Sequence, residues 1–224
     1  MIHIQSFVFN DFLENTYLLW DETKECLIID PGCYYAHESE DLKKFIDGNK
    51  LKPTLLLNTH CHVDHIFGNR FVMETYNITF YTNEIEVPIL NAAEAIGKLY
   101  GIHVTPSPQP NGFLNEGDEV KFGNSSLAIL FTPGHSPGSI CFYSSPDKFL
   151  IGGDVLFQGS IGRTDLPGGD YDTLMQSILN KVLLLPDDVK VYSGHGPMTT
   201  IGVEQKANPF VLEYAAERKK VSFS

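Results

Sequence analysis

Residues 59–65 read Thr59-His60-Cys61-His62-Val63-Asp64-His65 and come just after the apolar run Leu55-Leu56-Leu57. Three imidazoles and one carboxylate are thus concentrated where a buried strand is expected to leave the core. Imidazole nitrogens and carboxylate oxygens are common protein ligands of zinc and similar divalent metals. The stretch therefore predicts a metal centre at the end of a strand.

The spacing within this stretch predicts two metal positions rather than one. His60 and His62 are two residues apart in an extended segment, so their side chains can face the same way. Asp64 and His65 are adjacent and point in different directions, which makes a single metal for all four side chains difficult. We expect His60 and His62 to bind one metal, and Asp64 and His65 to bind a second. A His-rich surface loop without metal is the alternative, and the spacing argues against it.

Further ligands are predicted at three other strand ends that share one design. In each, an apolar strand is followed by a glycine and then by a side chain that can bind metal, namely His135 after Gly134, Asp154 after Gly153, and His195 after Gly194. Glycine allows a tight turn and a close backbone approach. Each segment alone could be an ordinary turn, but together with the histidine cluster they indicate one site at one edge of stacked sheets. Cys61 is expected to point away from the metals and to pack.

Composition narrows the class of protein. The 224 residues are 42% hydrophobic and 20% charged, as in ordinary globular proteins. The net charge of −12 argues against a nucleic-acid partner. We expect no signal peptide, because residues 1–9 have the pattern of a strand. No apolar run has membrane-spanning length, and the four cysteines have no paired spacing. We expect a single domain over residues 1–224, located in the cytoplasm, with a small-molecule substrate and no membrane or nucleic-acid partner.

The order of expected elements is mixed. Strands are predicted at 2–9, 15–20, 25–29, 54–57, 77–81, 119–122, 126–131, 139–143, 148–151 and 189–192. Helices are predicted at 39–47, from Ile66 to Tyr76, from about Asn83 to Tyr100, from Tyr171 to Val182 behind an Asp170 cap, and after Thr200. Residues 101–118 are expected to be irregular and could form a lid or binding loop.

The order and spacing of these motifs, from Asp30-Pro31-Gly32 to His195, resemble the metallo-β-lactamase superfamily. The resemblance implies an α+β fold, an αββα four-layer sandwich with the metal site at one sheet edge. It also implies that His60, His62 and His135 bind one metal, that Asp64, His65 and His195 bind the other, and that Asp154 bridges both. Asp30 is either an acid that orients the imidazoles or a simple turn residue.

The resemblance also suggests a branch of the superfamily. Three features argue against antibiotic hydrolysis. His65 is present, Asp154 takes the place of a cysteine ligand, and no export signal is expected. The ligand set and the runs 159–165, 194–200 and 208–210 are similar to short bacterial glyoxalase II-like hydrolases (hydroxyacylglutathione hydrolases). We therefore expect hydrolysis of thioesters such as S-lactoylglutathione by two divalent metals, with zinc as first choice and iron or manganese as alternatives. Asp64 and Asp154 are the expected catalytic residues.

Several alternatives stay open at this point. A persulfide dioxygenase would use one iron on His60, His135 and Asp154, and a lactonase would use nearly the same ligands. Arg163 lies where the glyoxalase II family places a basic residue for glutathione, but it could equally be a surface arginine paired with Asp165. Longer family members carry an extra C-terminal helical region for glutathione, which leaves another thioester open as the substrate. The oligomeric state is not predicted.

Overall fold

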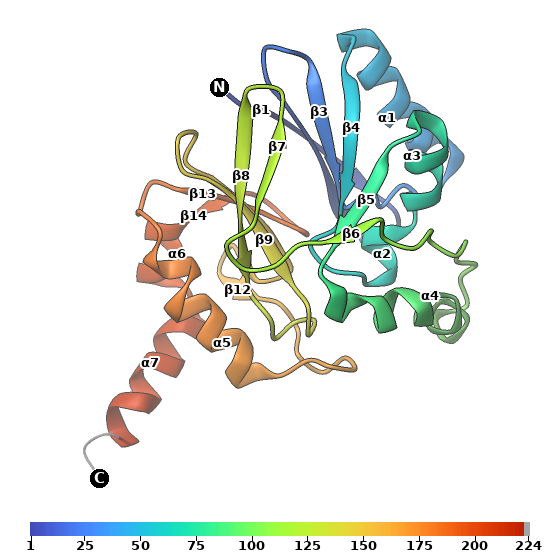
Figure 1. The fold of residues 1–224 in the computed structure, drawn as a ribbon. Helices are drawn as coiled ribbons and strands as arrows, with labels where there is room; N and C mark the ends of the chain where they lie inside the picture. The colour runs from blue at the N-terminus through green and yellow to red at the C-terminus, as the bar shows by residue number, and fades with distance from the viewer. Residues whose placement is uncertain (222–224) are drawn as a thin grey trace.

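The computed structural model describes residues 1–221, with side chains described as far as Arg218. Two six-stranded sheets lie face to face, with helices on both outer sides (Figure 1). The expected α+β fold, the αββα sandwich of the metallo-β-lactamase fold, is confirmed.

The first sheet contains the histidine motif. Its strands, in spatial order, are β1 (His3–Phe9), β2 (Glu14–Trp20), β3 (Glu25–Ile29), β4 (Lys52–Leu57), β5 (Thr79–Thr82) and β6 (Gly112–Phe113). The first three strands pair antiparallel, and β3 to β6 pair parallel. The carboxyl ends of β3 and β4 therefore lie at the same edge of this sheet.

The second sheet comes from the other half of the chain. Its order is β14 (Thr199–Thr200), β13 (Lys190–Ser193), β10 (Phe149–Gly153), β9 (Ile140–Ser144), β8 (Ser125–Phe131) and β7 (Glu119–Phe122). A separate small ribbon pairs β11 (Leu156–Phe157) with β12 (Ser160–Ile161). Strands β10 and β13 are parallel, and β8 runs in the same direction because β9 is antiparallel to both β8 and β10. The carboxyl ends of β8, β10 and β13 thus share one edge.

The helices form the outer layers (Figure 1). In chain order they are α1 (Ala36–Asn49), α2 (Val63–Ile66), α3 (Asn69–Tyr76), η1 (Glu84–Glu86), α4 (Val87–Tyr100), α5 (Tyr171–Asn180), η2 (Val182–Leu184), α6 (Ile201–Ala207) and α7 (Pro209–Val221). None of the helices within residues 1–221 has both the length and the apolar content that crossing a lipid bilayer requires.

Alternating side chains divide the core into three layers. In β4, Leu57 faces the second sheet, where it joins a cluster with Ile129 and Phe142. The preceding Leu56 faces the opposite way, into the cluster with Leu42 of α1. Strand residues alternate between faces with a period of two, so adjacent leucines serve different layers. A third cluster packs α5, α6 and α7 on the outer face of the second sheet.

The helices predicted after the histidine motif and after Asp170 differ from the observed ones. The helix expected from Ile66 to Tyr76 is split into α2 and α3 around Gly68. The Gly68 N–H donates to the Pro31 carbonyl at 2.7 Å, and a Cβ at this position would lie 2.3 Å from Cys33 Sγ. Contact with the β3–α1 connection therefore interrupts the helix. The helix expected from Tyr171 to Val182 ends at Asn180 and continues as η2, while Asp170 caps it as predicted by accepting from Thr173 N.

Candidate metal centre

The sandwich brings the side chains of the candidate centre together from four strand ends. His60 and the residues to His65 follow β4, His135 follows β8, Asp154 follows β10 and His195 follows β13. Two groups that share no residue result, each with ligand atoms within 4.8 Å of one another: His60, His62 and His135, and Asp64, His65 and His195. These two groups divide the side chains of the motif as its spacing predicts. A third group of the same kind, Asp30, His60 and His65, takes one histidine from each.

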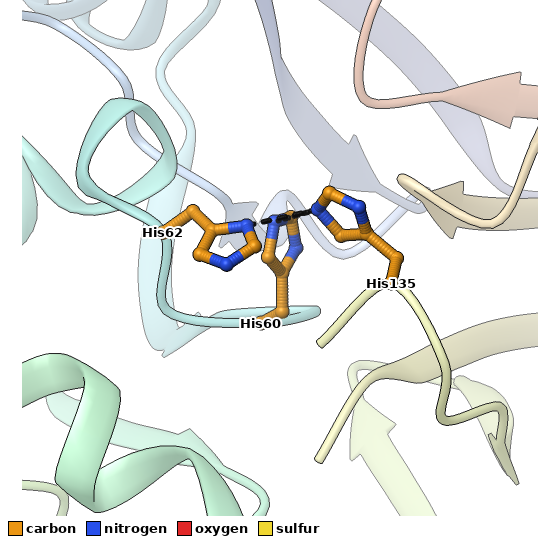
Figure 2. Close-up of side chains that lie close together, drawn as sticks. All are labelled: His60, His62 and His135. Carbon is orange, nitrogen blue, oxygen red and sulfur yellow. Dashed lines mark hydrogen bonds between the residues drawn. The ribbon is translucent and has the colours of Figure 1, made fainter. Parts of the chain in front are cut away.

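The first group presents ring nitrogens to one another. His62 Nδ1 lies 2.9 Å from His135 Nε2, which in turn lies 3.3 Å from His60 Nε2 (Figure 2). The remaining nitrogen of His135, Nδ1, is 2.8 Å from the Arg163 carbonyl and donates to it. That bond fixes the tautomer and leaves the His135 Nε2 lone pair facing the centre. Converging lone pairs of this kind fit a cation between them.

The second group combines imidazoles with a carboxylate. Asp64 Oδ2 lies 3.2 Å from His195 Nε2 and 3.7 Å from His65 Nε2. His195 Nδ1 donates to the Phe12 carbonyl at 3.0 Å, so its Nε2 also faces inward. The helical start at Val63 allows Asp64 and His65, although adjacent, to reach one point.

Asp154 lies between the two groups. Its Oδ2 is 3.5 Å from His135 Nε2 of the first group and 3.5 Å from His195 Nε2 of the second. Its Oδ1 is 3.6 Å from His65 Nε2. Within the described residues, neither this Oδ1 nor this Nε2 has a hydrogen-bond partner, although both are buried. Buried polar atoms are almost always paired, and 3.6 Å is too long for a hydrogen bond. The geometry fits a metal cation as the partner of both atoms.

The pKa values of the histidines differ between the two groups. Burial, followed by the neighbouring histidines, lowers the pKa of His60 and brings that of His62 to about 3, so these rings are neutral. The pKa values of His65 and His195 are raised instead. Burial acts to lower them, but the nearby carboxylates of Asp64 and Asp154 outweigh burial. The same pairing holds the pKa of Asp154 below its usual range despite burial. The carboxylates of the second group are therefore ionised, and a nearby positive charge, from protonated histidines or from a metal, stabilises them.

Asp30 orients one histidine of each group. Thr59 Oγ1 donates to Asp30 Oδ2 at 2.6 Å, so it must accept from His60 Nδ1, which is 3.0 Å away. The same Asp30 oxygen lies 3.2 Å from His65 Nδ1. Both histidines are thus fixed with Nε2 free, as is usual for imidazoles that bind metal. Of the two interpretations of Asp30, the structure supports the orienting acid.

Two buried glutamates near the centre are absent from the sequence prediction. Glu86 Oε2 accepts from Cys61 N at 2.8 Å, and its Oε1 accepts from Ser136 Oγ at 2.6 Å and from Gly138 N at 2.7 Å. It therefore ties the His60–His62 loop to the loop of His135. Glu14 is fully buried, and its Oε1 lies 3.9 Å from His65 Nδ1. Burial raises the pKa of both carboxyls.

The glycines before the ligands allow close approach, as predicted. A Cβ on Gly194 would lie 2.2 Å from Asp154 Oδ1 and 2.7 Å from His65 Cε1. Gly134 has φ +132°, and a Cβ there would lie 2.2 Å from the Leu174 backbone. Neither position tolerates a side chain without displacing a ligand loop or α5.

Arg163 and Cys61 have surroundings of different kinds. The Arg163 guanidinium is exposed and forms a two-point contact with Asp165, with Nε–Oδ1 at 2.7 Å and a terminal nitrogen to Oδ2 at 2.8 Å. Its side chain thus adopts the surface pairing that was the alternative to a glutathione contact. Cys61 is buried in the core beside Thr82 and away from the metal groups, as predicted.

Comparison with known proteins gives the family. The family model described as the metallo-beta-lactamase superfamily matches residues 10–195. The chain belongs to the metallo-β-lactamase superfamily. One superfamily relative, the hydroxyacylglutathione hydrolase GloC of Haemophilus influenzae, is 38% identical over 89% of this chain and 93% of its own length.

Two solved structures of the superfamily are also similar. The BLEG-1 B3 metallo-beta-lactamase has a TM-score of 0.84 at 38% identity, covering 93% of this chain and 99% of its own. TTHA1623, solved in a di-iron-bound form, has a TM-score of 0.83 at 34% identity, covering 92% of this chain and 99% of its own. With its two ligand groups, the chain is a metal-dependent hydrolase of the metallo-β-lactamase superfamily.

Proposed function

We propose that this chain hydrolyses thioesters such as S-lactoylglutathione with two divalent metals. In this proposal His60, His62 and His135 hold one metal, Asp64, His65 and His195 hold the other, and Asp154 bridges them. The observation that carries the proposal is the place of Asp154, whose oxygens lie 3.5–3.6 Å from histidines of both groups. When bound, two metals lower the pKa of a shared water, so that hydroxide is available near neutral pH.

The carboxylates would hold the attacking water in place. Burial acts to raise the pKa of Asp64 and Asp154, but the facing histidines lower both below the ordinary value. They are therefore poor proton acceptors and remain charged, which suits them to orient the water by accepting its hydrogen bonds. We assign them this holding role.

The substrate would approach over the exposed side of the centre. His60 and His65 are fully buried, whereas the His195 side chain is 27% exposed and Asp64 is 13% exposed. A thioester carbonyl can therefore reach the centre from the side where His195, Asp64 and the partly exposed His62 lie. A thiolate is a good leaving group, so no acidic side chain is needed on that side. Cys61 is not a rival nucleophile, because burial raises the pKa of its thiol well above the ordinary value.

The similarity to GloC supports the thioester proposal, since that relative carries the name hydroxyacylglutathione hydrolase. For the metal we propose zinc, because histidine and carboxylate ligands suit it. Iron is the main alternative, and the di-iron form of TTHA1623 supports it.

Hydrolysis of S-lactoylglutathione by metal-replete protein tests this function directly. We expect turnover that a chelator abolishes and that added zinc or iron restores. A cyclic ester assayed in parallel separates a lactonase from a thioesterase. Metal-replete protein that hydrolyses no thioester above the uncatalysed rate would contradict the proposal.

A β-lactam is the second candidate substrate, and the similarity to BLEG-1 favours it. The metal chemistry would be the same, because amide and thioester carbonyls both need polarisation and an attacking hydroxide. A chromogenic β-lactam assayed beside the thioester decides between them. We expect kcat/KM for the thioester to be the larger.

A further inference from the structure

An aromatic pocket lies beside the candidate metal centre. It has a volume of about 150 Å³. It forms where the tip of the β1–β2 hairpin meets the end of α2 and the end of α4. Its lining residues are Asn10, Asp11, Phe12, Tyr34, Phe67, Tyr100 and Ile102.

Aromatic rings make up most of its walls. The Phe12 ring lies 6.4 Å from that of Phe67 and 6.2 Å from that of Tyr100, the latter edge to face. The Tyr34 ring lies 4.8 Å from that of Phe67. Phe12 and Tyr100 keep 39% and 52% of their surface exposed, so the pocket opens to solvent on their side. Exposed aromatic rings around a concavity are typical of ligand sites.

The pocket shares a wall with the second metal group. Asn10 Nδ2 donates to the Asp64 carbonyl at 3.1 Å. The Phe12 carbonyl accepts from His195 Nδ1, and His195 is on the exposed side over which the substrate would approach. Phe67 is two residues after His65 in the chain. A group bound in the pocket would therefore lie next to the second metal group, beside the place proposed for the substrate carbonyl.

The size and charge of the pocket indicate which part of a thioester it takes. An apolar cavity of about 150 Å³ holds a molecule the size of benzene. Among the lining residues, Asp11 is the only charged one, and it accepts from the Tyr35 hydroxyl at 2.8 Å. Glutathione carries two carboxylates and one ammonium group. The pocket has no basic side chain to pair with the carboxylates, and the one carboxylate that could attract the ammonium group is already hydrogen-bonded to Tyr35. The fitting group is the uncharged acyl part.

We propose that this pocket binds a phenyl-sized acyl group, so that the preferred substrates are thioesters of aromatic acids rather than of lactate. This inference rests on the proposed thioester hydrolysis. The ring faces of Phe12, Phe67 and Tyr100 would contact the acyl group, and the thiol part would remain in solvent.

Two thioesters that differ only in this group provide the test. S-mandeloylglutathione has a phenyl ring where S-lactoylglutathione has a methyl group, and the rest of the two molecules is identical. We expect kcat/KM of the metal-loaded wild-type protein to be at least about tenfold higher for the mandeloyl compound. In Tyr100→Ala, which removes a wall of the pocket, this ratio should fall toward one. Tyr100→Phe, which keeps the ring, should retain it.

Leu99→Ala is the matched control, because Leu99 is on the same helix and is 86% exposed outside the pocket. It should keep the wild-type ratio, and metal content should be equal in all four proteins. Equal kcat/KM for the two thioesters, or a preference that Tyr100→Ala does not reduce, would overturn the pocket assignment and leave the thioesterase proposal standing. Failure of the metal-loaded protein on both compounds would overturn both proposals.

Discussion

The two halves of the candidate metal centre are both suited to bind a metal cation, but for different physical reasons. In the half made by His60, His62 and His135, burial keeps the rings neutral, and their lone pairs converge. In the half made by Asp64, His65 and His195, the carboxylates overcome burial and favour positive charge. The first half offers donors without charge, and the second offers charge as well. Asp154 lies between the two halves, so its substitution should weaken metal binding in both. Substitution of a residue that supports only one half should weaken metal binding mainly in that half.

Asp154→Ala should have the largest effect. It removes the carboxylate whose oxygens lie 3.5–3.6 Å from histidines of both groups, so we expect metal content to fall from about two to at most one per chain. Thioester turnover should fall at least about 100-fold. Asp188→Ala, which removes an exposed aspartate, should change neither. Turnover at the wild-type rate in Asp154→Ala would show that the two halves do not need a shared ligand.

Asp30→Asn should weaken both halves while keeping all seven ligands. Asparagine cannot accept at both side-chain positions, so the bonds to Thr59 and His65 cannot all persist. Loss of such supporting bonds costs about 10–100-fold in metal affinity. Competition with a chromogenic chelator measures it, and Asp41→Asn on the surface of α1 is the control. Unchanged affinity would mean that Asp30 does not orient the histidines.

Glu86→Gln should weaken metal binding in one half of the centre and leave it unchanged in the other. A glutamine oxygen can still accept from Ser136 and Gly138, but its NH₂ group then faces the Cys61 N–H. A donor facing a buried donor costs about 1–3 kcal/mol, and the cost falls on the loop of His60 and His62. We expect about a tenfold loss of affinity for one metal per chain, with the other unchanged, by isothermal titration. The exposed Glu84→Gln is the control, and equal losses at both metals would contradict this division.

Asp21→Asn should affect stability alone, because Asp21 is at the opposite end of β2 from the centre. It accepts from Thr23, Asn124 and Ser125 and so joins the two sheets. These bonds outweigh burial and lower its pKa from 3.8 to about 2. A depressed pKa stabilises the fold above pH 4, and this contribution is lost as the pH falls through about 2. We expect the variant to lose about 1–2 kcal/mol at pH 7 by urea unfolding, with metal content unchanged and the difference vanishing near pH 2.

Local patterns in the sequence were enough to predict the candidate ligands. Each candidate ligand follows a strand within a few residues. The motif around His60 and the glycines before His135 and His195 could therefore be recognised in the sequence. The two sheets could be predicted for the same reason, since alternating apolar residues mark most strands. The parallel strand ends then place these residues at one edge.

The supporting acids were not predictable in this way. Glu86 is at the start of a predicted helix, where an acidic residue is ordinary, and its three partners are 25–52 residues away. Glu14 begins a strand and is buried by distant segments, among them the His195 loop that pairs with it and His65. The break at Gly68 also depends on a distant contact, with Pro31. Such features arise from packing between segments and leave no local signal.

The number and identity of metals per chain in freshly purified, unsubstituted protein tests the central claim most directly. Elemental mass spectrometry against protein concentration gives both. Two occupied halves predict about two zinc, iron or manganese ions per chain. A single iron per chain, unchanged when metal is supplied in excess, would contradict the dinuclear hydrolase and favour the mononuclear dioxygenase that the sequence left open.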